Sequence, residues 1–199
     1  MKRSYHSNLA FLDLLFNALL CFAALFVIAL LLINPKEKRE GVIVKAEFLI
    51  TVTWPHNIHN DVDTYVEDPV GNLVFFKSQE EGLMHLDRDD IGIQNDKIAT
   101  AFGDVYYRDN REIVTIRGSV SGEYIVNVHL YSKNEDVSVP VTVQVDKINP
   151  FSTVFLDTVV LTVVGDEKTA CRFMVSNEGN VLQINRLQKS LTTNEHYGF

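Results

Sequence analysis

The stretch VIVKAEFLITVTW, from Val42 to Trp54, consists mainly of β-branched and aromatic residues and stops at Pro55. Runs of this kind are typical of β-strands, because branched and aromatic side chains pack well on a pleated surface. Eight further runs follow it, separated by turns that contain Gly, Pro or Asn. With no soluble helix predicted between them, the runs indicate an all-β sandwich. We expect the other strands at residues 64–66, 73–76, 113–117, 124–131, 137–145, 154–164, 170–175 and 181–184.

The segment before this domain is of a different kind. Residues 14–33, LLFNALLCFAALFVIALLLI, are twenty uncharged and mainly apolar residues, and residues 9–12 extend the run across Asp13. A helix of this length matches the roughly 30 Å hydrocarbon layer of a membrane. A cleaved signal peptide is the alternative, but its apolar region would be about 7 to 15 residues long and would end in small residues. We therefore predict an uncleaved membrane anchor. Lys and Arg flank it on both sides, so the positive-inside rule does not decide its orientation.

Asp13 is the ionisable residue within this apolar run. Such groups are costly inside a membrane and usually face a protein interior or a water path. At helical spacing, Asn17, Cys21 and Ala24 lie on the same stripe as Asp13, a pattern typical of helix packing. The alternative is that Asp13 lies where the helix leaves the membrane and is hydrated.

The sequence FLDLLFNALLCF at residues 11–22, after a short basic N-terminus, resembles the single helix of the B subunits of ion-driven motors. These are the MotB, ExbD, TolR and ZorB-like proteins. The resemblance implies a homodimer in the bacterial inner membrane, with a cytoplasmic N-terminus and a periplasmic domain. It also implies a partner of the MotA or ExbB type, a multi-span membrane protein that forms a pentamer. Asp13 would then bind and release the translocated ion, H⁺ or Na⁺.

Acidic residues are concentrated in one part of the sandwich. Residues 61–96 hold ten acidic residues against Lys77 and Arg88, so this segment carries a net charge of −8, equal to that of the whole chain. The carboxylates alternate around turns, which is how hard cations such as Ca²⁺ are bound. The alternative is a solvated acidic loop that keeps the domain soluble. The candidate Ca²⁺ ligands are Asp61, Asp63, Asp87, Asp89 and Asp90.

Three segments of the domain resemble YfaP-like bacterial exported domains. They are DVDTYVEDPVGN at residues 61–72, LDRDDIG at 86–92 and GEYIVNVHLY at 122–131. The similarity extends roughly from Thr51 to Val145. It implies an extracytoplasmic binding sandwich, in a compartment where millimolar Ca²⁺ is available.

Other functions find little support in the sequence. The net charge of −8 argues against nucleic-acid binding, because phosphate contacts require clustered Lys and Arg. His56 and His59 lie close together, but no further His or Cys completes a zinc motif, and we interpret them as part of a polar turn. No nucleophile elbow, P-loop or dinucleotide motif occurs, so we expect no enzyme. Cys171 is predicted to be a buried thiol, without an intrachain disulfide to Cys21. Pro140 predicts that its strand is an edge or is bulged there.

These features predict five parts in the chain. They are a cytoplasmic N-terminus at residues 1–8, a transmembrane helix at 9–34, a connector at 35–41, an extracytoplasmic β-sandwich at 42–187 and a fraying tail at 188–199. The leading functional hypothesis is the B-type subunit of a proton- or sodium-driven membrane motor, with the sandwich as its sensing or effector domain. The alternative is a membrane-anchored, calcium-dependent binding module without motor activity.

Overall fold

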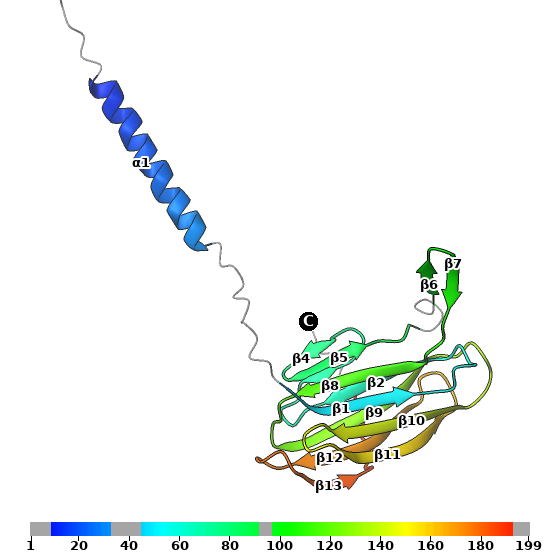
Figure 1. The fold of residues 1–199 in the computed structure, drawn as a ribbon. Helices are drawn as coiled ribbons and strands as arrows, with labels where there is room; N and C mark the ends of the chain where they lie inside the picture. The colour runs from blue at the N-terminus through cyan, green and yellow to red at the C-terminus, as the bar shows by residue number, and fades with distance from the viewer. Residues whose placement is uncertain (1–8, 33–44, 92–96, 193–199) are drawn as a thin grey trace, which may run out of the picture. The chain divides into compact units, whose positions relative to one another are not determined.

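The N-terminal part of the chain forms a single long helix. The computed structural model describes residues 9–32, 45–91 and 97–192, and it divides the chain into two units between residues 43 and 44. The first unit contains α1 (Leu9–Leu32), drawn in blue in Figure 1. Leucine and alanine, which favour helices, dominate its sequence. Its segment Leu9–Ala29 is long and apolar enough to cross a membrane. The remaining residues of the predicted helix, 33 and 34, lie outside the described ones.

The second unit is a sandwich of antiparallel strands. One sheet has six strands in the order β11-β10-β1-β8-β5-β4, and the other has five in the order β13-β12-β9-β2-β3. A separate two-stranded hairpin, β6–β7, projects from the sandwich in Figure 1. The strand bounds are β1 (Ala46–Thr53), β2 (Asp61–Glu67), β3 (Leu73–Val74), β4 (Glu80–Glu81), β5 (Met84–Arg88), β6 (Lys97–Thr100), β7 (Gly103–Tyr106), β8 (Arg111–Arg117), β9 (Gly122–Ser132), β10 (Val139–Lys147), β11 (Ser152–Leu161), β12 (Glu167–Val175) and β13 (Val181–Asn185).

The core lies between the two sheets and follows the alternation of side chains along each strand. On β1, Phe48, Ile50 and Val52 are fully buried, whereas the residues between them are partly exposed. The valines of β10 repeat this alternation. Aromatic rings join the two sheets, because the ring centre of Phe173 on β12 lies 5.4 Å from that of Phe48 on β1. Within its own sheet, Phe173 also stacks on Tyr124, at 5.2 Å. The apolar contacts between the sheets thus hold the sandwich together.

The predicted fold class, a single N-terminal helix followed by an all-β sandwich, is confirmed. Each of the nine predicted strands coincides with a strand of the structure, although residues 42–44 of the first lie outside the described ones. Strands β4 to β7 are not predicted from the sequence. The prediction that the strand of Pro140 is at an edge is confirmed at that position. β1 pairs with residues 142–147 of β10, so its pairing ends before Pro140. Pro140 is therefore paired with β11 on one side and not with β1 on the other.

The segment after β13 is more ordered than the sequence predicts. The prediction that the tail frays is wrong for residues 188–192. Leu191 is fully buried in a small apolar cluster with Tyr65, and its backbone N–H donates a 2.7 Å hydrogen bond to the Glu167 carboxylate. This segment therefore covers part of the sandwich. Residues 193–199 lie outside the described ones.

Candidate cation site

Glu112 is a charged residue at a position where strand alternation calls for an apolar one. On β8, Glu112, Val114 and Ile116 share a face, and each is at most 1% exposed. Glu112 Oε2 accepts a 2.6 Å hydrogen bond from the backbone N–H of Thr64, which lies in the other sheet. Glu112 Oε1 is also buried and receives no hydrogen bond from a donor group of the described residues. Such a carboxylate destabilises the fold unless a proton or a cation compensates its charge.

Strand β2 places two further carboxylates in this region. Asp61 and Asp63 are two residues apart, so they lie on the same face of the strand. Asp63 is buried, and its Oδ2 lies 3.7 Å from Nδ1 of His129 on the adjacent strand β9. Asp61 Oδ1 is buried without a hydrogen-bond partner among the described residues. The start of β2 is therefore strongly acidic.

The chain immediately after β5 completes the site. Asp90 is 1% exposed, and its Oδ2 accepts a 3.3 Å hydrogen bond from the backbone N–H of Arg111, at the start of β8. Asp89 contributes an oxygen to a compact group: one ligand atom each of Asp63, Asp89 and Glu112 lie within 4.8 Å of one another. We define the acidic cluster as Asp61, Asp63, Asp89, Asp90 and Glu112.

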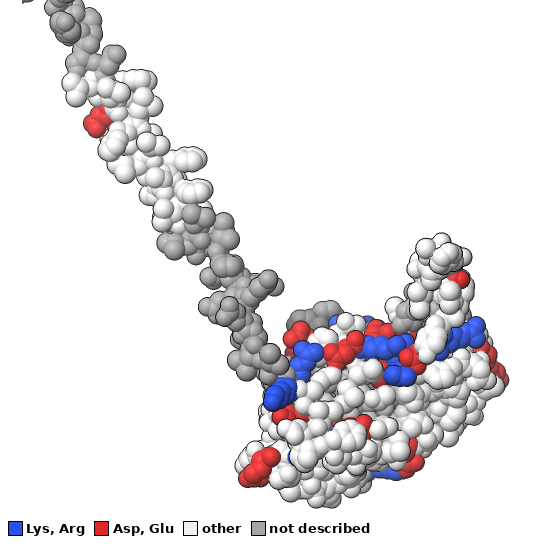
Figure 2. Space-filling model, in the orientation of Figure 1, with Lys and Arg blue, Asp and Glu red and all other residues white. Residues whose placement is uncertain are grey.

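Two nearby arginines form ion pairs with an aspartate outside the acidic cluster. Arg88 Nη1 lies 3.2 Å from Asp109 Oδ2, and Arg111 Nη2 lies 3.1 Å from Asp109 Oδ1. The guanidinium of Arg88 also donates to the backbone carbonyls of Asp109 and Arg111. Figure 2 shows basic and acidic side chains mixed along this rim of the sandwich, below the hairpin. These contacts hold the ends of β5 and β8 together.

Burial and crowding raise the pKa values of two carboxylates in the acidic cluster, Asp61 and Glu112. Burial raises the pKa of Asp61 from 3.8 to about 7, and the charges of neighbouring carboxylates in the acidic cluster add to the shift. Burial raises the pKa of Glu112 well above its usual value; the hydrogen bond from Thr64 opposes this shift, and the neighbouring aspartates add to it. At neutral pH, the folded domain therefore holds protons that free carboxyl groups would release.

The chemistry of the acidic cluster suits a hard cation. The side chain of Asp89 is within hydrogen-bonding reach of Glu112, but two carboxyl groups form a hydrogen bond only when one of them holds a proton. A divalent cation would replace that proton and bind both groups. The ligand atoms are all carboxylate oxygens, the donors that Ca²⁺ prefers, and several of them converge on one point. The arrangement therefore favours Ca²⁺ over metals that require nitrogen or sulfur ligands.

Four of the five Ca²⁺ ligands predicted from the sequence lie together in the acidic cluster. Asp87 does not, because alternation along β5 directs it elsewhere: its carboxylate accepts hydrogen bonds from Thr115 and from Arg117. The sequence prediction also misses Glu112. The sequence contained one signal for it: Glu112 is two residues before Val114, so the two lie on the same face of the strand. A charged residue on a core-facing position is rarely buried unless it is paired, which marks Glu112 as a candidate ligand.

His56 and His59 lie in a polar loop, and Cys171 is buried, as the sequence predicts. His56 Nδ1 accepts a hydrogen bond from the Asn110 backbone, and His59 contacts the Glu135 carboxylate, so both act as polar groups in loops. Among the described residues, the metal-binding arrangement contains neither of them. Cys171 is fully buried, and burial raises the pKa of its thiol to about 12, which keeps it unreactive. Neither Cys171 nor Cys21 forms a disulfide.

The raised pKa of Asp61 predicts a pH-dependent difference between the wild type and Asp61→Asn. Between about pH 4 and pH 7, folded wild type holds a proton on Asp61 that the unfolded chain has released. Wild type therefore loses stability relative to the variant as the pH rises through this window, and the difference levels off above it. Urea unfolding at pH 5, 6, 7 and 8 in the presence of a chelator measures the difference. A difference that does not change with pH would contradict the predicted burial of this charge.

The chain was compared with protein families, curated proteins and solved structures. No protein-family model and no curated protein matches the chain. Two solved structures are similar to it. A crystal structure of a protein of unknown function shares 17% identity, with a TM-score of 0.46, over 74% of this chain and 94% of that one. A homologue of the telluride resistance protein TerD from Streptomyces coelicolor A3(2) shares 14% identity, with a TM-score of 0.45, over 75% of this chain and 95% of that one.

Proposed function

We propose that this chain is a membrane-anchored, extracytoplasmic binding module whose β-sandwich holds Ca²⁺ in the acidic cluster. The observation that carries the proposal is the convergence of Asp63, Asp89 and Glu112 from three separate segments. It is supported by Oε1 of Glu112, which is buried and receives no hydrogen bond from a donor group of the described residues. Bound Ca²⁺ joins the start of β2 to the ends of β5 and β8, and so orders the loops at this end of the sandwich. The module binds a ligand and has no catalytic role.

The membrane anchor in this proposal is α1. Its large apolar side chains are exposed around the whole helix, and a bilayer would cover them. The N-terminus lies in the cytoplasm and the sandwich in the periplasm of a bacterial inner membrane. There, the millimolar Ca²⁺ outside the cytoplasm fills a site of modest affinity. Extracellular calcium modules bind with dissociation constants of about 10⁻⁴ to 10⁻³ M.

A Ca²⁺ titration followed by thermal melting tests the proposal. Binding to the folded state alone stabilises it by RT ln(1 + [L]/Kd), which is about 1.4 to 2.7 kcal/mol at 10 to 100 times Kd. For a domain of this size, that corresponds to a rise of roughly 3–10 °C. Mg²⁺ at the same concentration should raise the melting temperature less, because it gives up its water ligands reluctantly. The absence of any shift at 10 mM Ca²⁺ would remove the claim.

A second candidate function is that of an ion-driven motor subunit, and the position of Asp13 favours it. Asp13 falls within the segment Leu9–Ala29 that is able to span a membrane, and the rest of α1 carries no charged residue. In the helical structure, Asn17, Cys21 and Ala24 share the stripe of Asp13, a face suited to packing against another helix. In this function, two copies of the chain bind a pentamer of a MotA- or ExbB-like partner, and Asp13 carries H⁺ or Na⁺.

The motor hypothesis predicts that Asp13→Asn abolishes ion flux without preventing assembly. The amide keeps the size of the side chain but does not take up and release a proton or balance the charge of Na⁺. The complex of the chain with a MotA- or ExbB-like partner is purified and placed in vesicles, and flux is followed with pH- and sodium-sensitive dyes. Asp136→Asn, at a fully exposed carboxylate in the sandwich, is the matched control and should retain full flux. Undiminished flux in Asp13→Asn would exclude the motor.

A further inference from the structure

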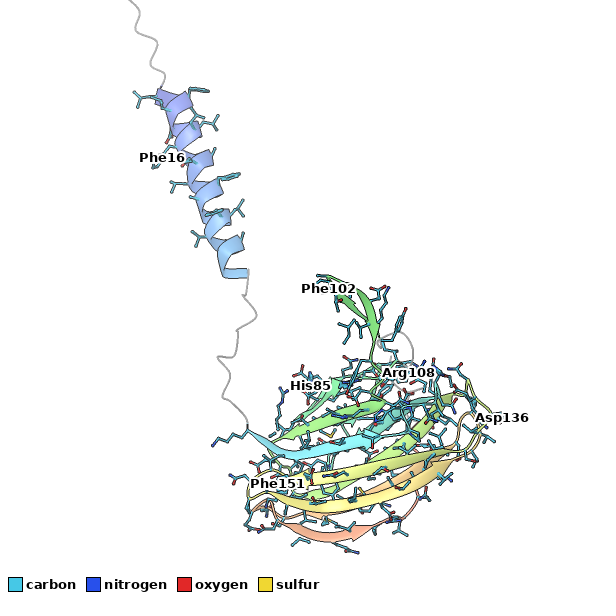
Figure 3. All side chains as sticks on the ribbon, turned by 45° about the vertical axis from the view of Figure 1, so that its right-hand side comes forward. Phe16, His85, Phe102, Arg108, Asp136 and Phe151 are labelled. Carbon is cyan, nitrogen blue, oxygen red and sulfur yellow. The ribbon has the colours of Figure 1, made fainter. Side chains whose placement is uncertain are left out.

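The β6–β7 hairpin exposes an apolar surface that the sandwich does not cover. Every residue from Lys97 to Arg108 is exposed, and Phe102 at the turn is fully exposed. Ile98 and Val105 are direct cross-strand partners, so they lie on one face of the hairpin. Figure 3 shows Phe102 at the tip, away from the sheets of the sandwich. Two-stranded hairpins are marginally stable alone, and contiguous exposed apolar groups mark an interaction surface.

The arrangement of residue types along the hairpin matches a membrane interface. The tip is Ala101-Phe102-Gly103, while Tyr106 and Tyr107 lie at the base, each about two-thirds exposed. Tyrosine is enriched at the level of lipid headgroups, and phenylalanine is suited to the acyl region below them. Lys97, at the base opposite Tyr106, and Asp104, nearer the tip, neutralise one another in a 2.7 Å ion pair. Four residues per strand give a length of about 13 Å, enough to reach 5–10 Å into a bilayer.

The base of the hairpin is fixed to the sandwich beside the acidic cluster. The chain leaves the sandwich after Asp90 and returns at Arg111, whose backbone N–H donates to the Asp90 carboxylate. Arg88 and Arg111 both pair with Asp109, which lies between the hairpin and β8. A cation bound by Asp89 and Glu112 would join the same two chain ends. These contacts hold the segment between β7 and β8 against the sandwich, which lowers the entropy cost of inserting the tip of the hairpin.

The chain's own anchor brings a bilayer within reach of the hairpin. Residues 32 and 46, the end of α1 and the start of β1, are 14 residues apart, so at most about 50 Å separates them. The hairpin joins the sandwich near Arg111, which pairs with Thr53 at the far end of β1. Since β1 spans only about 26 Å, the connector is long enough for the hairpin to meet the membrane surface.

We propose that the β6–β7 hairpin inserts Phe102 into the bilayer that holds α1, so that the chain is attached to the membrane through both α1 and the hairpin. This inference rests on the membrane anchor of the proposed function. Protein partners are the alternative occupants of the apolar surface. The bilayer is favoured because the same chain supplies it at high effective concentration.

Depth-dependent fluorescence quenching tests the insertion in the full-length protein. The variant Phe102→Trp is reconstituted, with Ca²⁺ present, into vesicles of phosphatidylethanolamine and phosphatidylglycerol with brominated acyl chains. The natural Trp54 is 3% exposed and gives a constant background in the unmodified protein. The matched control is Phe151→Trp, because Phe151 is also exposed, at 71%, and follows Lys147, which pairs with Phe48 at the opposite end of β1.

Insertion predicts that the tryptophan at position 102 loses most of its emission to brominated lipid, whereas the one at position 151 does not. Emission from position 102 that is quenched by aqueous acrylamide and not by brominated lipid would overturn the proposal. Emission from position 102 that neither quencher reduces would also overturn the proposal. It would indicate that the hairpin is covered by protein, such as a second copy of the chain. Flotation of the protein with the vesicles reports the anchor separately, so failure of the anchor and failure of the hairpin are distinguishable.

Discussion

The Glu112→Gln variant is expected to lose the Ca²⁺-dependent rise in melting temperature and, without Ca²⁺, to melt above the wild type at pH 8. The amide oxygen still accepts the hydrogen bond from the Thr64 N–H, so the local structure is kept. The amide N–H₂ donates to the Asp89 carboxylate, which replaces the repulsion between two carboxylates. Loss of one ligand charge weakens Ca²⁺ binding, because affinity follows the number of charged ligands.

The measurement is thermal melting of both proteins with a chelator and with 10 mM Ca²⁺. Glu80→Gln removes the same charge at an exposed position on β4, and this control should keep the wild-type response to Ca²⁺. A cation ligand predicts two effects of Glu112→Gln with opposite signs: a higher melting temperature with the chelator and a smaller rise on adding Ca²⁺. A purely structural residue does not predict this combination. If Glu112→Gln melts below the wild type under both conditions and keeps its Ca²⁺ shift, Glu112 is a structural residue and not a ligand.

Phe173→Ala is expected to lower the free energy of unfolding of the sandwich by about 3–5 kcal/mol. The Phe173 side chain is fully buried, and its ring stacks on Tyr124 at an interplanar angle of 11°. It also contacts Phe48 from the other sheet, so its removal leaves a cavity where the two sheets meet. Surrounding side chains held in regular strands refill such a cavity only in part.

Urea unfolding of the full chain in detergent measures this loss. Phe151→Ala removes the same side chain from an exposed loop and should change stability by less than about 0.5 kcal/mol. A loss below about 1 kcal/mol in Phe173→Ala would show that the two sheets do not depend on this aromatic contact.

Much of this fold is predicted from the sequence because apolar and other side chains alternate clearly along the long strands. Apolar residues largely alternate with other residues in the predicted runs 42–54 and 137–145, and the structure places β1 (Ala46–Thr53) and β10 (Val139–Lys147) side by side in one sheet. The strands that the sequence does not predict are short. β4 has two residues, and Met84–Arg88 contains only two apolar side chains. Too few residues alternate there to produce a recognisable pattern.

The sequence predicts the aspartates of the acidic cluster but not its glutamate. Asp61, Asp63, Asp89 and Asp90 are close in sequence and share a charge-rich segment, so composition alone indicates them. Glu112 joins them through the packing of β8 against β2, two strands from different sheets, and no spacing along the chain encodes that contact. Leu191 is a similar case. It lies in a polar segment, and its burial beside Tyr65 follows from tertiary packing.

The most direct test of the account is a crystal structure of the protein grown or soaked in 10 mM Ca²⁺, with anomalous scattering used to locate the metal. The account predicts one Ca²⁺ ion bound by oxygens of Asp63, Asp89 and Glu112, at the 2.3–2.6 Å distances typical of this metal. An acidic cluster without anomalous density at this concentration, with Glu112 and Asp89 held together by a shared proton, would contradict it.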